Sequence, residues 1–174
     1  WLDKTAFLRH LYSNFQISLD GFHGPAHWAR VQQNGLILAE HENVRPDVVI
    51  LFALLHDHMR IDEGYDHGHG PRAVKNMQKF RNKYFEIDQL GWNSLEHAIN
   101  GHSDGGLHAT PLVKVCWDAD RLDLGRVDIM PDPFYLCTNT AKHPMIILDA
   151  YRRSRKWVRR IEKRTNALNK KLPL

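Results

Sequence analysis

Hydrophobic positions along the chain recur at the spacing of a helix and not at the alternation of a strand. Prolines stand where the first residue of a helix is often found, and a glycine pair stands where a helix often ends. These signals predict helices over residues 3–15, 25–42, 46–59, 72–84, 91–103 and 110–124, with one or two more after Pro144. Residues 59–71 and 126–139 are interrupted by glycines or prolines and should be irregular. Since no hairpin pattern occurs, the sequence predicts an all-α fold.

The most apolar segment is the run of residues 48–55. Its propensity alone would suit a buried strand, but its length and the preceding proline favour a buried central helix. No apolar run reaches the roughly 18 residues of a membrane span, and no segment resembles a signal peptide. We therefore expect a cytoplasmic protein without a membrane partner. The 174 residues fit one domain, residues 1–174, that is large enough to bury a core without disulfides.

Charge is distributed unevenly along the chain. Residues 151–174 contain ten of the 24 basic residues and one of the 20 acidic residues, Glu162, so this segment carries +9 and the remainder −5. We expect a basic helix over about residues 145–172. A solvated helix face is the simplest interpretation, and binding to nucleic acid or to an acidic partner is the alternative.

Histidine is enriched, with twelve residues in the chain, and neutral imidazole is a common metal ligand. The two cysteines, Cys116 and Cys137, are too few for a disulfide framework or a cysteine-based zinc site. His56 and Asp57 end the apolar run, so an imidazole and a carboxylate emerge together from a buried helix. A buried carboxylate needs a donor or a cation, which makes this pair a candidate for metal binding.

Helical spacing distinguishes two neighbouring aspartates. Asp120 has apolar residues at positions −7, −4, −3 and +4, whereas Asp118 shares its face with Lys114 and Arg121. We therefore expect Asp120 to be the buried carboxylate that needs a partner. Asp118 is assigned to a supporting or salt-bridged position beside the ligands.

The same test applies to the histidines. His102 shares a helix face with apolar residues and should point inward, while His97 has polar neighbours. His27 lies within a predicted helix, whereas His23 precedes the proline that begins it. His27 is therefore the stronger candidate for a metal ligand.

Three short motifs resemble those of the HD-domain metal-dependent phosphohydrolases. They are His27-Trp28-Ala29-Arg30-Val31, Leu54-Leu55-His56-Asp57 and Ala119-Asp120-Arg121-Leu122-Asp123. Their order and spacing also agree, with 29 residues from the first histidine to the second and 63 from Asp57 to Asp120. The resemblance covers about residues 22–125, and the strings around the second and third motifs resemble an unassigned bacterial subgroup.

The resemblance implies a helical bundle around a buried metal site, with His27, His56, Asp57 and Asp120 as ligands. It implies hydrolysis of a phosphomonoester or phosphodiester, often of a nucleotide, by a metal-activated water. Two imidazoles and two carboxylates suit one divalent ion, such as Mn, Fe, Co, Ni or Mg, and Zn is compatible. Some members bind a second ion through further histidines, but the tandem His-His of many such members is absent, so we expect one ion.

Charge on the phosphoryl oxygens requires fixed cations or hydrogen-bond donors. We assign catalytic roles to Asp57, Arg60, His69 and His102, and substrate contacts to Arg72, Asp104 and Arg121. The arginines could instead be solvated, and His69 could cap a helix. The alternative functions are a binding module for nucleic acid or an acidic partner with a structural metal, and an HD fold without activity. No signal in the sequence indicates an oligomeric state.

Overall fold

The structure, a computed structural model, describes the backbone of residues 1–169 and the side chains of residues 1–164. These residues form helices and no β-strand, which confirms the all-α prediction. The elements are α1 (Lys4–Asn14), α2 (Pro25–His41), α3 (Pro46–Leu55), α4 (His69–Met77), α5 (Gln89–Gly101), α6 (Pro111–Arg121), the 3-10 helices η1 (Leu124–Val127) and η2 (Pro133–Tyr135), and α7 (Pro144–Asn169). Positions 170–172 of the predicted basic helix lie outside the described residues.

Helix α3 is the centre of the bundle. Seven of its ten residues are buried, so it is apolar on all sides, as a core helix is. It packs against α2, α5 and α6. The helix ends at Leu55 and not near Met59 as predicted, because residues 56–59 form a turn at its C-terminal end. This turn begins with the His56-Asp57 pair.

A small residue allows three helices to approach closely. A Cβ atom on Gly35 of α2 would lie 2.4 Å from Cγ1 of Val49 in α3 and 3.2 Å from Cβ of Ala119 in α6. Next to it, Nδ2 of Asn34 donates to the carbonyl of Ala119 at 3.0 Å, and Nη2 of Arg153 in α7 donates to Oδ1 of Asn34 at 2.8 Å. These contacts fix α2, α6 and α7 relative to one another.

The helix predicted over residues 72–84 differs from the observed α4, which begins and ends earlier. After α4 the chain turns back toward α1, and Phe80 and Phe85 become buried there. Their rings lie 5.3 and 5.6 Å from the ring of Phe7, measured between centroids. This aromatic cluster forms between segments that are distant in sequence, so it overrides the local helical pattern.

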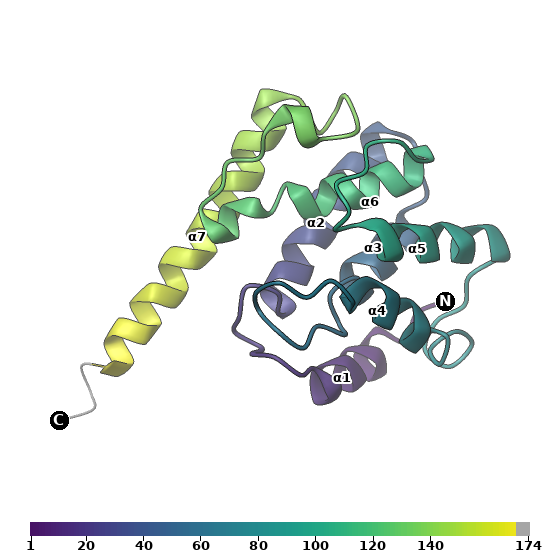
Figure 1. The fold of residues 1–174 in the computed structure, drawn as a ribbon, viewed down its shortest axis with the longest axis horizontal. Coiled ribbons are helices and arrows are strands. Elements are labelled where there is room, and N and C mark those ends of the chain that lie inside the picture. The colour runs from purple at the N-terminus through teal and green to yellow at the C-terminus, as the bar shows by residue number, and fades with distance from the viewer. Residues whose placement is uncertain (170–174) are drawn as a thin grey trace.

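A single long helix, α7, follows Pro144, where one or two were predicted. Its first half packs on η1 and α2, while its second half extends away from the bundle (Figure 1). The irregular segment of residues 126–139 contains η2 and the end of η1. Among the described helices, none combines the length and apolarity that a bilayer crossing would need.

Candidate metal centre

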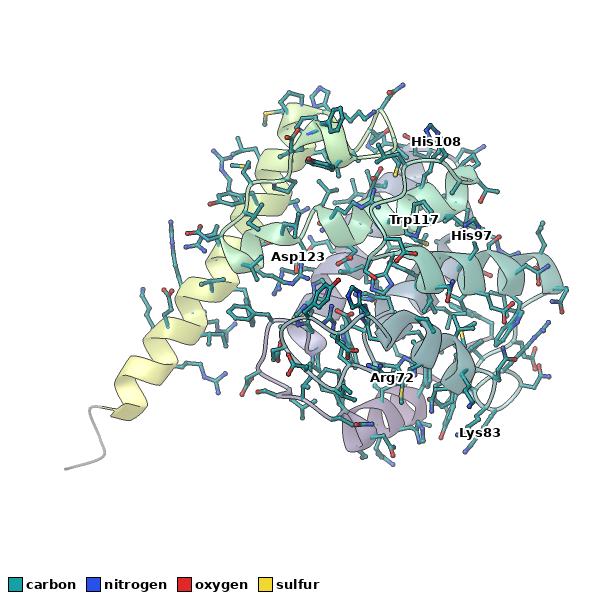
Figure 2. The ribbon with its side chains drawn as sticks, viewed as in Figure 1. Arg72, Lys83, His97, His108, Trp117 and Asp123 are labelled. Atoms are coloured by element: carbon teal, nitrogen blue, oxygen red, sulfur yellow. The ribbon has the colours of Figure 1, made fainter. Side chains whose placement is uncertain are left out.

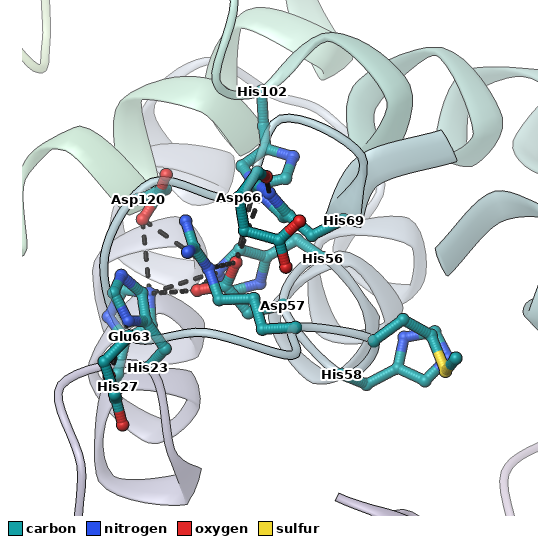
Figure 3. A network of polar contacts seen from close by, with 12 residues as sticks. His23, His27, His56, Asp57, His58, Glu63, Asp66, His69, His102 and Asp120 are labelled. Atoms are coloured by element: carbon teal, nitrogen blue, oxygen red, sulfur yellow. Dashed lines mark hydrogen bonds and ion pairs between the residues drawn. The ribbon is translucent and has the colours of Figure 1, made fainter. Parts of the chain in front are cut away.

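Three helices bring histidine and aspartate side chains to one place in the core. His27 comes from α2, His56 and Asp57 follow α3, and Asp120 comes from α6. The first three are at most 2% exposed, and the side chain of Asp120 is 16% exposed. Figure 3 shows the contacts that join His27, Asp57 and Asp120, with His58 turned away from them.

The distances between these four side chains suit a shared cation. Nε2 of His27 lies 3.0 Å from Nε2 of His56, and both nitrogens are within 3.5 Å of Oδ2 of Asp57. Oδ1 of Asp120 lies 3.3 Å from Nε2 of His27 and 3.9 Å from Nε2 of His56. Donor atoms bound at about 2.1 Å and at right angles to one ion are roughly 3.0 Å apart. His27, His56 and Asp57 therefore form a group able to hold one cation, and Asp120 lies beside both of its imidazoles.

The hydrogen bonds of the other ring nitrogens indicate which nitrogens are available to a metal. Nδ1 of His27 donates to Oδ2 of Asp123 at 2.7 Å, and Nδ1 of His56 donates to the carbonyl of Phe52 at 3.1 Å. Because both acceptors lack a proton to give, Nδ1 carries the hydrogen and Nε2 carries the lone pair in each neutral ring. Two nitrogens whose lone pairs face each other at 3.0 Å repel, so this distance requires a proton or a metal ion between them.

A second histidine pair repeats this arrangement on the other side of Asp57. Nε2 of His69 lies 2.8 Å from Nε2 of His102, and Oδ1 of Asp57 lies 3.4 and 3.6 Å from them. Their Nδ1 atoms bond to the carbonyls of Asp66 and Ile99. Asp57 therefore directs one oxygen to each pair, and the residues form two groups able to hold a cation.

Electrostatics hold the Asp57 carboxylate ionised but act in opposite directions on the two imidazoles. Burial raises the pKa of Asp57, but the charge of His56 and hydrogen bonds with His102 and His27 outweigh it and hold that pKa well below its usual range. Burial lowers the pKa of His56. Burial and the charge of Arg126 also lower the pKa of His27, yet hydrogen bonds with neighbouring carboxylates outweigh both and raise it to about 9. The buried carboxylates and imidazoles thus share protons with one another. A divalent cation bound between these groups would take the place of those protons.

Asp123 is the supporting residue that the sequence reasoning missed. Its buried carboxylate accepts hydrogen bonds from Nδ1 of His27 at 2.7 Å and from Nε and Nη2 of Arg30 at 2.6 and 2.9 Å. Oγ of Ser154 in α7 donates to the same group at 2.5 Å. Figure 2 labels Asp123 in the turn between α6 and η1. Asp123 follows Asp120 by three residues, as Arg30 follows His27, so helical spacing could have identified this contact. Asp123 fixes the orientation of the His27 ring.

Asp118 does not support the ligands, and that prediction is wrong. Its carboxylate accepts hydrogen bonds at 2.7 Å from the backbone N–H groups of Cys137 and Thr138 and from Oγ1 of Thr138. It is also fully buried, whereas Asp120 is partly exposed, the reverse of the expected order. The donors come from a loop about twenty residues away, which helical periodicity does not reveal.

Arg60 and Arg72, two arginines near the site, already have partners. Nε of Arg60 donates to Oδ1 of Asp57 at 2.8 Å, so this side chain contacts a predicted ligand and is not simply solvated. Arg72 pairs with Asp66 and donates through Nε to the carbonyl of Met59 at 3.2 Å. These two arginines hold the loop of residues 59–71 around the histidines.

The remaining substrate assignments fall at the surface. Arg121 donates to the carbonyls of Tyr135 and Gly106 at 2.9 and 2.8 Å and thereby joins two loops. Asp104 is exposed. The roles of Arg72, Asp104 and Arg121 in substrate binding stay predictions. His23, the alternative to His27, is buried and bonds through Nδ1 to Glu63 at 2.8 Å, outside both groups.

The chain belongs to the HD-domain family, whose model matches residues 26–125. HD domains bind divalent metal ions, and the buried groups described above are able to hold one. The chain is also similar to the crystal structure of a predicted HD superfamily hydrolase from an uncultured Thermotogales bacterium. The TM-score is 0.66 and the identity 24%, with 92% of each chain covered, so the fold extends over nearly the whole molecule. A search of curated proteins found no match.

Proposed function

We propose that this protein is a metal-dependent phosphohydrolase that cleaves a phosphomonoester or phosphodiester of a small substrate, with a nucleotide as the leading candidate. The observation that carries the proposal is the pair of imidazole nitrogens of His27 and His56, 3.0 Å apart and flanked by Asp57 and Asp120. These four residues would hold a divalent ion of Mn, Fe, Co, Ni or Mg, with Zn also compatible.

The second histidine pair supports a second ion, contrary to the expectation of one. His69 and His102 repeat the arrangement of the first pair, and the two oxygens of Asp57 face the two pairs separately. A carboxylate in this position can bridge two cations. We therefore propose that the site takes up to two ions and that His69 and His102 act as ligands.

A bound divalent ion lowers the pKa of a coordinated water and polarises a phosphoryl oxygen. The residues of the chain supply the positioning. Asp57, fixed by Arg60, directs oxygens to both histidine pairs and can orient the attacking water. Asp123 holds the His27 ring so that Nε2 faces the site. Asp120, the most exposed of the four ligands, marks the side from which a substrate could approach.

The test is to measure bound metal by mass spectrometry in the wild type and in the His56→Ala and Asp120→Ala variants. Matched controls are His97→Ala and Asp149→Ala, which remove exposed residues of the same types. All samples are then assayed against phosphomonoesters, phosphodiesters and nucleotides with each candidate ion. We expect one or two ions per chain and hydrolysis, both lost only in the two site variants. Metal content and hydrolysis untouched by both site substitutions would contradict the proposal.

A second candidate function is binding of nucleic acid or an acidic partner, with the metal structural. It is supported by the exposed basic residues along α7, which are Arg152, Lys156, Arg159, Arg160, Lys163 and Arg164. Salt-dependent binding of single-stranded oligonucleotides that persists in His56→Ala, without hydrolysis in the wild type, would favour it. Metal binding without hydrolysis or partner would indicate an inactive HD fold.

A further inference from the structure

Arg126 is a buried arginine without a partner. The residue is 8% exposed, and its Nε and Nη1 atoms are buried without a hydrogen bond. It forms no ion pair with the residues whose side chains the structure describes. Burying an unpaired charge is strongly unfavourable, so an arginine in this state indicates a missing anion.

The position of Arg126 is fixed next to the metal centre. It lies in η1, six residues after Asp120, and its backbone N–H donates to the carbonyl of Asp123 at 3.0 Å. The preceding Gly125 packs so closely on α7 that a Cβ atom there would lie 2.9 Å from side-chain atoms of both Tyr151 and Ser154. The segment from α6 to η1 thus carries, at intervals of three residues, the predicted ligand Asp120, the His27-supporting Asp123, and Arg126.

The charge of Arg126 acts on two of the predicted ligands. After burial, it is the next cause that lowers the pKa of His27. It also acts on Asp120, where hydrogen bonding to His27 and the charge of His56 contribute more to the lowered pKa. Both effects agree with the place of Arg126 in η1, just after the segment that carries Asp120.

The other arginines around the centre have protein anions. Arg30 is paired with Asp123, Arg60 with Asp57, and Arg72 with Asp66. Arg126 differs from these three because no described carboxylate is paired with it. The anion that would compensate its charge must therefore come from outside the described chain. Guanidinium groups bind phosphate oxygens well, through charge-assisted hydrogen bonds.

We propose that Arg126 binds the oxygens of the phosphoryl group held at the metal centre, and that it is the substrate-contacting arginine of this site. This inference rests on the proposed function. It adds to Arg72 and Arg121, the arginines assigned to substrate from the sequence, a residue just beyond the segment that the family model matches. Negative charge on the phosphoryl oxygens persists in the transition state, so the same contact would assist hydrolysis.

The test compares wild type with Arg126→Met and Arg126→Lys, and with Arg152→Gln, an exposed arginine of α7, as control. Each Mn²⁺-loaded protein is titrated with inorganic phosphate by calorimetry, and metal content and thermal midpoint are measured in parallel. We expect Arg126→Met to weaken phosphate binding about 10- to 100-fold, the loss typical of a hydrogen bond to a charged group. The phosphate affinity of Arg126→Lys should lie between those of Arg126→Met and the wild type, and the control should bind phosphate as the wild type does.

The thermal midpoint separates this role from a structural one. Without phosphate, Arg126→Met should melt at or above the wild-type temperature, because it removes an unpaired buried charge. A lower midpoint, loss of bound metal, unchanged phosphate affinity, or no phosphate binding by the wild type would each overturn the inference. The proposed function can fail separately from this inference. If the wild type binds phosphate through Arg126 but hydrolyses no ester, only the proposed activity is refuted.

Discussion

Replacing Asp123 by asparagine is the sharpest test of how the centre is held together. Its carboxylate receives four donors, two on each oxygen. Oδ1 accepts from Nε of Arg30 and Oγ of Ser154, and Oδ2 accepts from Nδ1 of His27 and Nη2 of Arg30. In Asp123→Asn one oxygen becomes an NH₂ group, which places a donor against Nε or Nη2 of Arg30 whichever way the amide is turned.

The size of the effect follows from this geometry. The substitution removes a hydrogen bond of Arg30 and leaves this arginine, whose side chain is 9% exposed, without a counter-charge. Breaking a buried ion pair by removing one partner reduces the free energy of unfolding by about 3–5 kcal/mol. The His27 ring also loses its support, and substitutions of this kind weaken metal binding roughly 10- to 100-fold.

Asp118→Asn is a matched control, because Asp118 is equally buried and accepts three hydrogen bonds from the loop around Thr138. Urea unfolding gives the stability of both variants, and titration with Mn²⁺ followed by mass spectrometry gives metal affinity. We expect both variants to be destabilised and only Asp123→Asn to lose metal affinity. Equal metal affinity in the two variants would refute the role assigned to Asp123.

Three further outcomes test the packing and the charges. Gly35→Ala should lower the free energy of unfolding by about 1–3 kcal/mol in urea, because its Cβ would lie 2.4 Å from Cγ1 of Val49; wild-type stability would contradict the close packing. The hydrogen bond with Arg45 lowers the pKa of Asp47 despite burial, so Asp47→Asn should lose up to about 1 kcal/mol at pH 7. This loss should vanish as acid protonates the wild-type carboxylate below pH 3.8, and a loss that persists there would exclude the ion pair as its cause. Burial raises the pKa of Cys137 to about 11, so maleimide at pH 7 should label it slowly before unfolding and rapidly after, and rapid native labelling would contradict this.

Local sequence signals predicted most helix starts and the central helix, because prolines and apolar runs themselves favour these structures. Pro25, Pro46 and Pro144 do begin helices, and the apolar run after Pro46 is the buried central helix. The predictions failed where distant segments decide the structure. The C-terminal end of α4 is one such place, since Phe80 turns back to pack on Phe7.

The candidate site shows the same division. His56 and Asp57 were found because their signal, a polar pair that ends an apolar run, is contained in neighbouring residues. The choice between Asp118 and Asp120 used burial, and the structure reverses that order because a loop supplies donors to Asp118. The assignment of Asp120 as a ligand rested on this helical test together with the resemblance of Ala119-Asp120-Arg121-Leu122-Asp123 to a family motif. Asp123 was missed as a support because its partners, His27 and Arg30 of α2 and Ser154 of α7, are distant from it in sequence.

The contacts of α7 explain why the site extends beyond the segment that defines the family. Ser154 donates to the carboxylate that orients His27, and Tyr151 packs against the glycine that precedes Arg126. Both residues lie outside positions 26–125, the segment that the family model matches. Ser154 supports the predicted ligand His27 through Asp123, and Tyr151 fixes the backbone next to Arg126, the proposed phosphoryl-binding arginine. The basic helix, which the sequence left as a solvated face or alternatively a binding element, therefore has a structural connection to the metal centre through its first half. The exposed basic residues farther along it, such as Arg159 and Arg160, take no part in that connection.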